Sequence, residues 1–189
     1  DNTDAYDRLR IQEGFSLAYP PRARECWVTH ACNHQTGVNA LLPLRFHVAM
    51  RGALGIGSNL RELPEAELAE YRRHIAFYKR VRHLIQDGDL YRLERLEQLG
   101  RSIWQYVSPD ASASVYALAT RETMVGLRPL PPPLRGLNPG WTYRVSDLDG
   151  QEVLRATGLD LMVQGLPGDD PLHLCHRPGF ARMVHIERL

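Results

Sequence analysis

Residues 64–88 read PEAELAEYRRHIAFYKRVRHLIQDG, and this stretch is the longest regular pattern in the sequence. Its apolar side chains recur at steps of three and four, which places them on one face of a helix: Leu68, Tyr71, Ile75, Tyr78, Val81 and Ile85. Pro64 suits the first position of a helix, and Gly88 suits the residue that stops one. The stretch therefore predicts a long amphipathic helix from Pro64 to about Asp87.

The sequence has a different character on each side of this helix. Upstream, helical patterns toward Ser16 and over Leu44–Met50 are mixed with short apolar strands at Cys26–Thr29 and Ala53–Gly57. Downstream, strand patterns follow one another with turns between them: Trp104–Val107, Ser114–Leu118, Thr142–Val145, Glu152–Leu154 and Met183–Ile186. We expect an α/β part over residues 1–90 and an antiparallel β-sandwich over residues 91–189.

Composition limits the classes of protein to which the chain can belong. Hydrophobic residues make up 43% of the 189 residues and charged residues 24%, as in an ordinary globular protein. The net charge of +1 argues against an electrostatic partner such as nucleic acid. Three cysteines and the lack of a long apolar run favour a reduced, cytoplasmic protein that binds no membrane.

The opening tract offers carboxylates for acid/base chemistry. Asp1, Asp4 and Asp7 lie where a strand is expected to give way to a helix. In (β/α)₈ barrels this edge forms the active site, and glycoside hydrolysis needs two carboxyl groups. Helix capping is the simpler account of the same residues, because aspartate is a preferred N-cap. The tract by itself favours the cap.

Three other patterns are weaker. Zinc-ligand residue types gather at Cys26, His30, Cys32 and His34, but their spacing fits no familiar finger, so we expect no metal site. Gly52, Gly55 and Gly57 do not have dinucleotide-loop spacing, and close packing of a strand on a helix explains them. Among the tryptophans, Trp104 and Trp141 fit a core, whereas Trp27 lies near a loop and could stack on a sugar.

Several tracts, taken together, resemble the α-galactosidases of glycoside hydrolase family 36. The first matches are Asp1-Asn2-Thr3-Asp4, then Ile11-Gln12, Gly14, Ser16 and Tyr19-Pro20, then Asn33-His34-Gln35-Thr36-Gly37. Later matches are Arg45, Val48-Ala49-Met50, Gly52 and Leu54-Gly55, followed by Tyr78-Lys79, Arg82, Leu84-Ile85, Gly88-Asp89 and Tyr91-Arg92-Leu93. In the second part, Gly136-Leu137-Asn138-Pro139 and Gly158-Leu159-Asp160-Leu161-Met162 also resemble family tracts, so the matches run in order over almost the whole chain. The departures are Trp27, Cys32 and Val38, where the family usually has His, Pro and Arg.

The resemblance implies the last part of a catalytic (β/α)₈ TIM barrel followed by a C-terminal β-domain. It also implies that Asp1 is the general acid/base of a retaining α-galactosidase acting on raffinose- or melibiose-type oligosaccharides. The nucleophilic aspartate of the family lies in a K-W-D tract that this chain does not contain. Candidate substrate contacts are Asn2, Asp4, Trp27, Asn33 and His34. The resemblance implies no metal or cofactor, and a homo-oligomeric intact protein.

Two alternatives to hydrolysis stay open. A related enzyme could transfer the galactosyl group to another sugar, or residues 1–189 alone could be an inactive piece with at most weak carbohydrate binding. A half barrel would leave strand edges and apolar faces uncovered. We therefore expect the isolated chain to be inactive and prone to aggregation.

Overall fold

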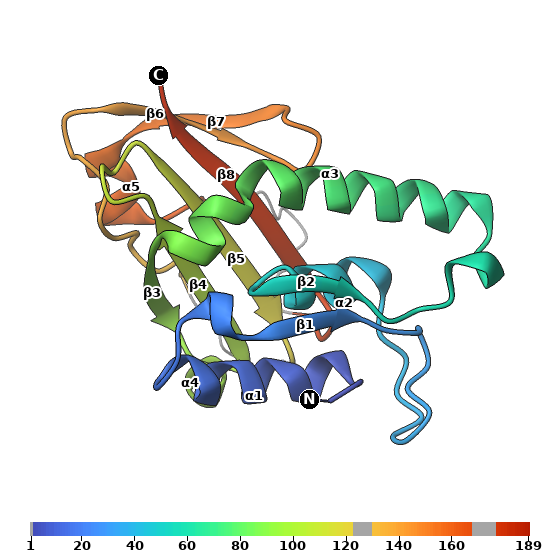
Figure 1. Ribbon diagram of the computed structural model, residues 1–189. Helices are drawn as coiled ribbons and strands as arrows, with labels where there is room; N and C mark the ends of the chain where they lie inside the picture. Colours follow the sequence, from blue (N-terminus) through green and yellow to red (C-terminus); the bar gives the residue numbers. More distant parts are fainter. Residues whose placement is uncertain (1, 123–129, 168–176) are drawn as a thin grey trace.

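The first 88 residues form helices around a small parallel sheet in the computed structural model, which describes residues 2–122, 130–167 and 177–189 (Figure 1). The elements are α1 (Ala5–Ser16), β1 (Glu25–Val28), α2 (Leu42–Ala49), β2 (Ala53–Ile56) and α3 (Glu65–Asp87), with short 3₁₀ turns at Pro21–Ala23 and Leu60–Glu62. Strands β1 and β2 pair in parallel, with Cys26 opposite Leu54. The mixture of helices and short strands predicted upstream of residue 90 is confirmed.

Helix α3 confirms the long amphipathic helix, with three differences in detail. It begins at Glu65, so Pro64 is the N-cap and not the first helical residue. Its buried face is wider than the predicted stripe, since it includes His74 and Phe77. At its end, a Cβ on Gly88 would clash with the carbonyl oxygen of Leu84 and would lie 2.8 Å from that of Val107, so the close approach of both backbone segments requires glycine there.

The described residues after α3 form β3 (Asp89–Glu94), α4 (Leu96–Leu99), β4 (Arg101–Val107), β5 (Ala113–Thr120), β6 (Thr142–Ser146), β7 (Glu152–Thr157), α5 (Gly158–Gln164) and β8 (Ala181–Arg188). These six strands build one antiparallel sheet, in the order β3-β4-β5-β8-β6-β7. A hairpin around Ser108 joins β4 to β5, and a turn at Asp149-Gly150 joins β6 to β7.

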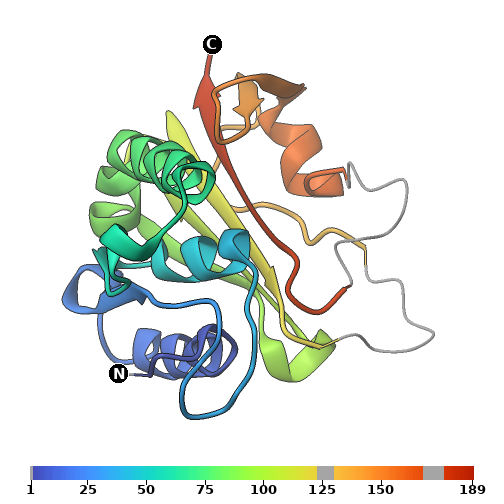
Figure 2. The same ribbon diagram turned by 90° about the vertical axis from the view of Figure 1, so that its right-hand side faces the viewer.

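Both faces of this sheet are covered. Helices α2 and α3 lie on one face, and α5 lies on the other (Figure 2). Strand β4 shows the consequence, because its side chains alternate: Trp104 and Tyr106 join the α3 core, whereas Ile103 and Val107 join the other. Every residue of β4 is therefore buried.

The structure supports the β-sandwich predicted for residues 91–189 only in part. The antiparallel sheet is present, but all described strands after residue 88 belong to one sheet. In the described residues, α5 and the side chains of Leu134, Leu137 and Leu166 contribute to the layer that covers its second face. A two-sheet sandwich and a domain boundary at residue 90 stay predictions.

Buried arginine and aromatic side chains join the helices to the sheet. Arg51, which is fully buried, donates to the hydroxyl and the carbonyl of Ser102, both at 2.8 Å. Its guanidinium group also lies over the ring of Trp104, 5.1 Å from the ring centre, in a cation–π contact. Burial lowers the pKa of Arg51 to about 10. The helical part and the sheet therefore share one core.

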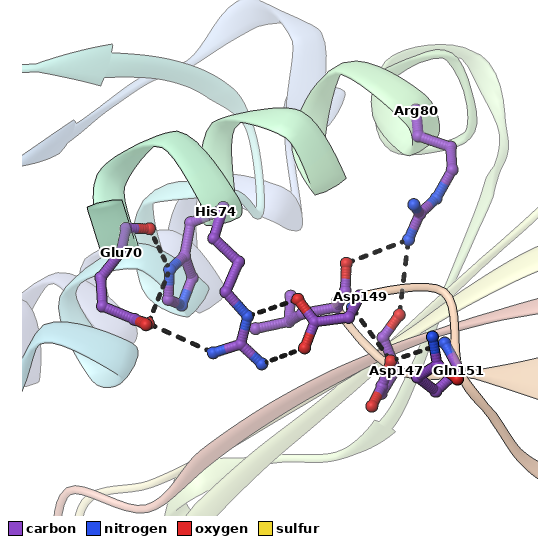
Figure 3. A network of polar contacts seen from close by, with 8 residues as sticks. Glu70, His74, Arg80, Asp147, Asp149 and Gln151 are labelled. Atoms are coloured by element: carbon purple, nitrogen blue, oxygen red, sulfur yellow. Dashed lines mark hydrogen bonds and ion pairs between the residues drawn. The ribbon is translucent and has the colours of Figure 1, made fainter. Parts of the chain in front are cut away.

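A polar network adds a second connection between α3 and the sheet (Figure 3). Arg73 donates to both carboxylate oxygens of Asp149 at 2.6 Å, and Arg80 donates to the backbone carbonyls of Asp147 and Leu148. The side chain of Asp147 in turn accepts from backbone N–H groups in the β6–β7 turn. The turn is thus held against the exposed side of α3.

Candidate catalytic site

The tract before α1 lies at the carboxyl end of β1. The hydroxyl of Thr29, the residue after the strand, donates to the carbonyl of Thr3 at 2.7 Å. Arg8, 2% exposed, donates to the carbonyls of Asn2 and Trp27 and so ties the tract to the strand from the helix side. Burial lowers the pKa of Arg8.

Asp4 is the N-cap of α1, and its carboxylate has a second bond. Oδ1 accepts from the backbone N–H of Tyr6 at 2.8 Å, the usual capping contact. Oδ2 accepts from the hydroxyl of Thr36 at 2.7 Å, across 32 residues of sequence. Asp4 is 4% exposed, so its two oxygens are used within the chain.

Asn33 organises the loop that faces this tract. Its Oδ1 accepts from the backbone N–H groups of Gln35 and Thr36 at 2.8 and 2.9 Å, which closes a tight turn. Its Nδ2 donates to the hydroxyl of Thr3 at 2.8 Å. Asn33 is 6% exposed, and this loop and the opening tract are therefore held together by side chains from both.

Arg45 supports the same junction from α2. Its guanidinium group donates to the carbonyl of Thr29 at 2.6 Å and to Oε1 of Glu67 at 3.0 Å. The side chain of Arg45 is 4% exposed, so this ion pair is largely shielded from solvent. The end of β1 is thus fixed by contacts to α1, α2 and α3.

The structure brings together some of the predicted site residues and not others. Asn2, Asp4 and Asn33 belong to one hydrogen-bonded cluster, in which the Asn2 side chain accepts from the backbone N–H of Asp4 at 2.8 Å. His34 is exposed on the adjoining loop. Asp1 lies outside the described residues.

Trp27 is half-buried on β1, and β2 is shaped to receive it. A Cβ at Gly55 would come within 3.1 Å of the indole ring, and one at Gly57 within 3.6 Å. At Gly52 a Cβ would lie 2.9 Å from the carbonyl of Arg24. The glycines therefore accommodate β1 and the segment before it, and the predicted packing against a helix was wrong.

The four zinc-type residues do not converge. Cys26 is buried in the core, whereas His30, Cys32 and His34 are exposed on the loop beyond β1. Among the described residues, no three His, Cys, Asp or Glu side chains lie close enough together to hold a metal ion. The space between Thr3 and the end of β1 is also too small for a water molecule. The described residues alone thus form a scaffold at this place and not a sugar pocket.

The sequence alone assigned no role to the residues that make this scaffold: Thr3, Arg8, Thr29, Thr36 and Arg45. Thr3, Thr36 and Arg45 lie inside tracts that resemble the family, and a short hydroxyl beside a turn is a common hydrogen-bonding group. The partners of Arg8 and Arg45 could not be predicted, because they are backbone carbonyls distant along the chain.

Two family models match consecutive parts of the chain. Melibiase matches residues 1–88, and the glycosyl hydrolase family 36 C-terminal domain matches residues 101–177. No helix in the described ranges is long and apolar enough to cross a membrane.

Known proteins similar to this chain carry α-galactosidase names. α-Galactosidase AgaA of Geobacillus stearothermophilus is 38% identical over 161 residues, covering 82% of this chain and 22% of the relative. α-Galactosidase C of Emericella nidulans is 37% identical over 169 residues, covering 88% of this chain and 21% of the relative. The chain thus spans less than a quarter of the length of these relatives.

Solved structures agree with these relatives. AgaB of Geobacillus stearothermophilus, a family 36 α-galactosidase, superposes with a TM-score of 0.86 at 34% identity, covering 100% of this chain and 25% of that one. A variant of AgaA in complex with raffinose has the same TM-score at 32% identity, with the same coverage. The chain belongs to glycoside hydrolase family 36.

Proposed function

We propose that residues 1–189 supply the acid/base part of a retaining α-galactosidase, with Asp1 as the general acid/base. The observation that supports it most is the fixed position of Asn2, Thr3 and Asp4 at the carboxyl end of a parallel strand. Active-site residues of (β/α)₈ barrels occupy that end of the strands. The nucleophile in this proposal is an aspartate outside residues 1–189.

The reaction proceeds by double displacement. Protonated Asp1 donates its proton to the leaving glycosidic oxygen while the nucleophilic carboxylate attacks the anomeric carbon. Asp1 then removes a proton from water, which attacks the galactosyl–enzyme ester and releases galactose with retained configuration. Loss of the nucleophile's charge in the intermediate lowers the pKa of Asp1, because a nearby negative charge favours the protonated form.

The proposed substrates are oligosaccharides with terminal α-linked galactose, of the raffinose and melibiose type. In support, relatives have been solved with raffinose and with stachyose. Of the five predicted contacts, Asn2, Trp27 and His34 have side chains that are not fully buried in the chain itself. Trp27 offers an aromatic face for the apolar side of a sugar ring.

The test uses an enzyme that carries residues 1–189 together with the nucleophilic aspartate. Asp1→Ala is expected to lower kcat/KM for raffinose by about 10²–10⁴-fold, since a positioned acid contributes that much. For 4-nitrophenyl α-galactoside the loss should be much smaller, because its leaving group needs no proton. Equal losses on both substrates would reject the acid role of Asp1.

Transfer of galactose to a second sugar is the alternative reaction, and it uses the same intermediate. Product analysis with 4-nitrophenyl α-galactoside as donor and excess sucrose as acceptor separates the two: free galactose supports hydrolysis, and galactosylated sucrose supports transfer. Residues 1–189 alone should release no 4-nitrophenol from the aryl galactoside, because one of the two carboxylates is missing.

We also propose the architecture and setting that accompany this function. Residues 1–90 form the end of a (β/α)₈ barrel and residues 91–189 a C-terminal β-sandwich domain, in a cytoplasmic homo-oligomer. The core shared by α3 and β4 supports a fixed arrangement of the two parts. Light scattering of the longer enzyme tests the oligomer, since a monomeric mass would contradict it.

A further inference from the structure

We infer that Asp4, Thr36 and Asn33 are positioning residues for the proposed acid/base, because they fix the tract that joins Asp1 to α1. This inference rests on the proposed function and adds roles that differ from direct sugar contact. Its starting point is that Asp4 and Asn33 are buried and that their side-chain polar atoms bond to the chain itself.

Helix capping does not account for Asp4. A cap needs one oxygen, and serine, threonine or asparagine would serve as well as aspartate. Oδ1 alone makes the capping bond to Tyr6, whereas Oδ2 accepts the Thr36 hydroxyl. The second oxygen is what a carboxylate adds, and its bond joins the tract to the loop at residues 33–37. Bonds to a charged acceptor are also stronger than neutral ones.

The other contacts fix each residue of the tract in turn. Asn2 is held through its carbonyl by Arg8, and through its side chain by the backbone of Asp4. Thr3 is held through its carbonyl by Thr29 and through its hydroxyl by Asn33. The three residues that follow Asp1 in the sequence are therefore fixed in position. A fixed support matters for an acid/base, because a displacement of 1 Å can cost about 10²-fold in rate.

Thr36→Val is the decisive variant, in the longer enzyme that carries both carboxylates. Valine keeps the shape of threonine and removes the donor to Asp4, at an exposed position where folding is least affected. We expect kcat/KM for raffinose to fall about tenfold, with the value for 4-nitrophenyl α-galactoside within about twofold of the parent. Thr36→Ser, which retains the hydroxyl, should restore the raffinose value.

Thr157→Val is the matched control. The Thr157 hydroxyl donates to Oδ2 of Asp160 at 2.6 Å at the start of α5, so the control loses the same kind of bond elsewhere. It should leave kcat/KM unchanged for both substrates. The inference is overturned if Thr36→Val behaves like Thr157→Val, or if Thr36→Val lowers kcat/KM equally for both substrates. If Asp1→Ala discriminates between the substrates and Thr36→Val does not, the positioning role alone is rejected; if Asp1→Ala fails to discriminate, the proposed function falls.

Discussion

Two junctions hold this chain together: one is formed by large buried side chains and the other by short polar side chains. Where α3 meets the sheet, the large side chains of Trp104, Phe77 and Tyr106 are fully buried, and the buried Arg51 contacts Trp104 and Tyr106. Where the opening tract meets the loop at residues 33–37, short polar side chains bond to one another and to the backbone. Stability should depend on the first junction and catalytic geometry on the second.

The largest loss of stability should follow from truncating a large buried side chain in the first junction. Trp104→Ala removes a fully buried ring that packs against Arg51 and Arg24. We expect the free energy of unfolding to fall by about 3–5 kcal/mol, seen as a lower melting temperature or loss of folded protein. Trp141→Ala, at a partly exposed ring, is the control and should cost clearly less. A Thr36→Val variant that melts as early as Trp104→Ala would break the comparison between the junctions.

The second-largest effect should be a loss of folding stability at acidic pH. Burial, and then the charge of nearby His74, lower the pKa of His47 to about 3. Unfolded histidine takes up its proton near pH 6.5. The stability due to neutral His47 is therefore complete above pH 6.5 and is lost as the pH falls toward 3, by about 2 kcal/mol at pH 5.

Melting temperatures between pH 7 and pH 4.5 measure this acid dependence. His47→Leu should make the decline shallower, whereas His30→Leu, at an exposed loop position, should leave it unchanged. Some decline should remain in His47→Leu, because burial also lowers the pKa of His74 and of His185. An unchanged slope in His47→Leu would show that protonation of His47 is not coupled to unfolding.

The smallest loss of stability should come from the exposed ion pair at the edge of the same junction. Arg73 and Asp149 are 40% and 44% exposed, and exposed ion pairs contribute about 1 kcal/mol or less. Arg73→Gln should lower the melting temperature slightly, and the difference should shrink in 0.5 M salt. The control is Arg72→Gln, which disturbs a pair within α3 only. A salt-independent loss would mean that Arg73 acts through packing and not through charge.

Much of the first junction could be predicted from sequence, because it depends on local periodicity. The steps of three and four in residues 64–88 predicted α3, but they missed His74 as part of its buried face. The His74 ring stacks on Phe46 of α2, and a local pattern does not show which neighbouring element covers a helix. The second junction could not be predicted in the same way. The bond from Thr36 to Asp4 joins positions 32 apart, and no local pattern reveals it.

The aspartates show the same limit. Capping preference correctly indicated a helix start after the opening tract, but it could not say which residue is the cap, and the structure assigns Asp4. Nor could it reveal that the second oxygen of Asp4 has a partner in another loop. The order of strands was equally hidden, since β8 pairs with β5 and β6 and not with its neighbour in sequence, β7.

The central place of β8 in the sheet has a consequence for synthesis on the ribosome. Strands β5 and β6 each pair with β8, and α2 packs against it. These three earlier elements therefore cannot complete their contacts until residues 181–188 are present. Until those residues leave the exit tunnel, the facing edges of β5 and β6 have no partner, and unpaired edges invite aggregation. The nascent chain is therefore expected to need chaperone protection until β8 has left the exit tunnel, and to complete its sheet only then.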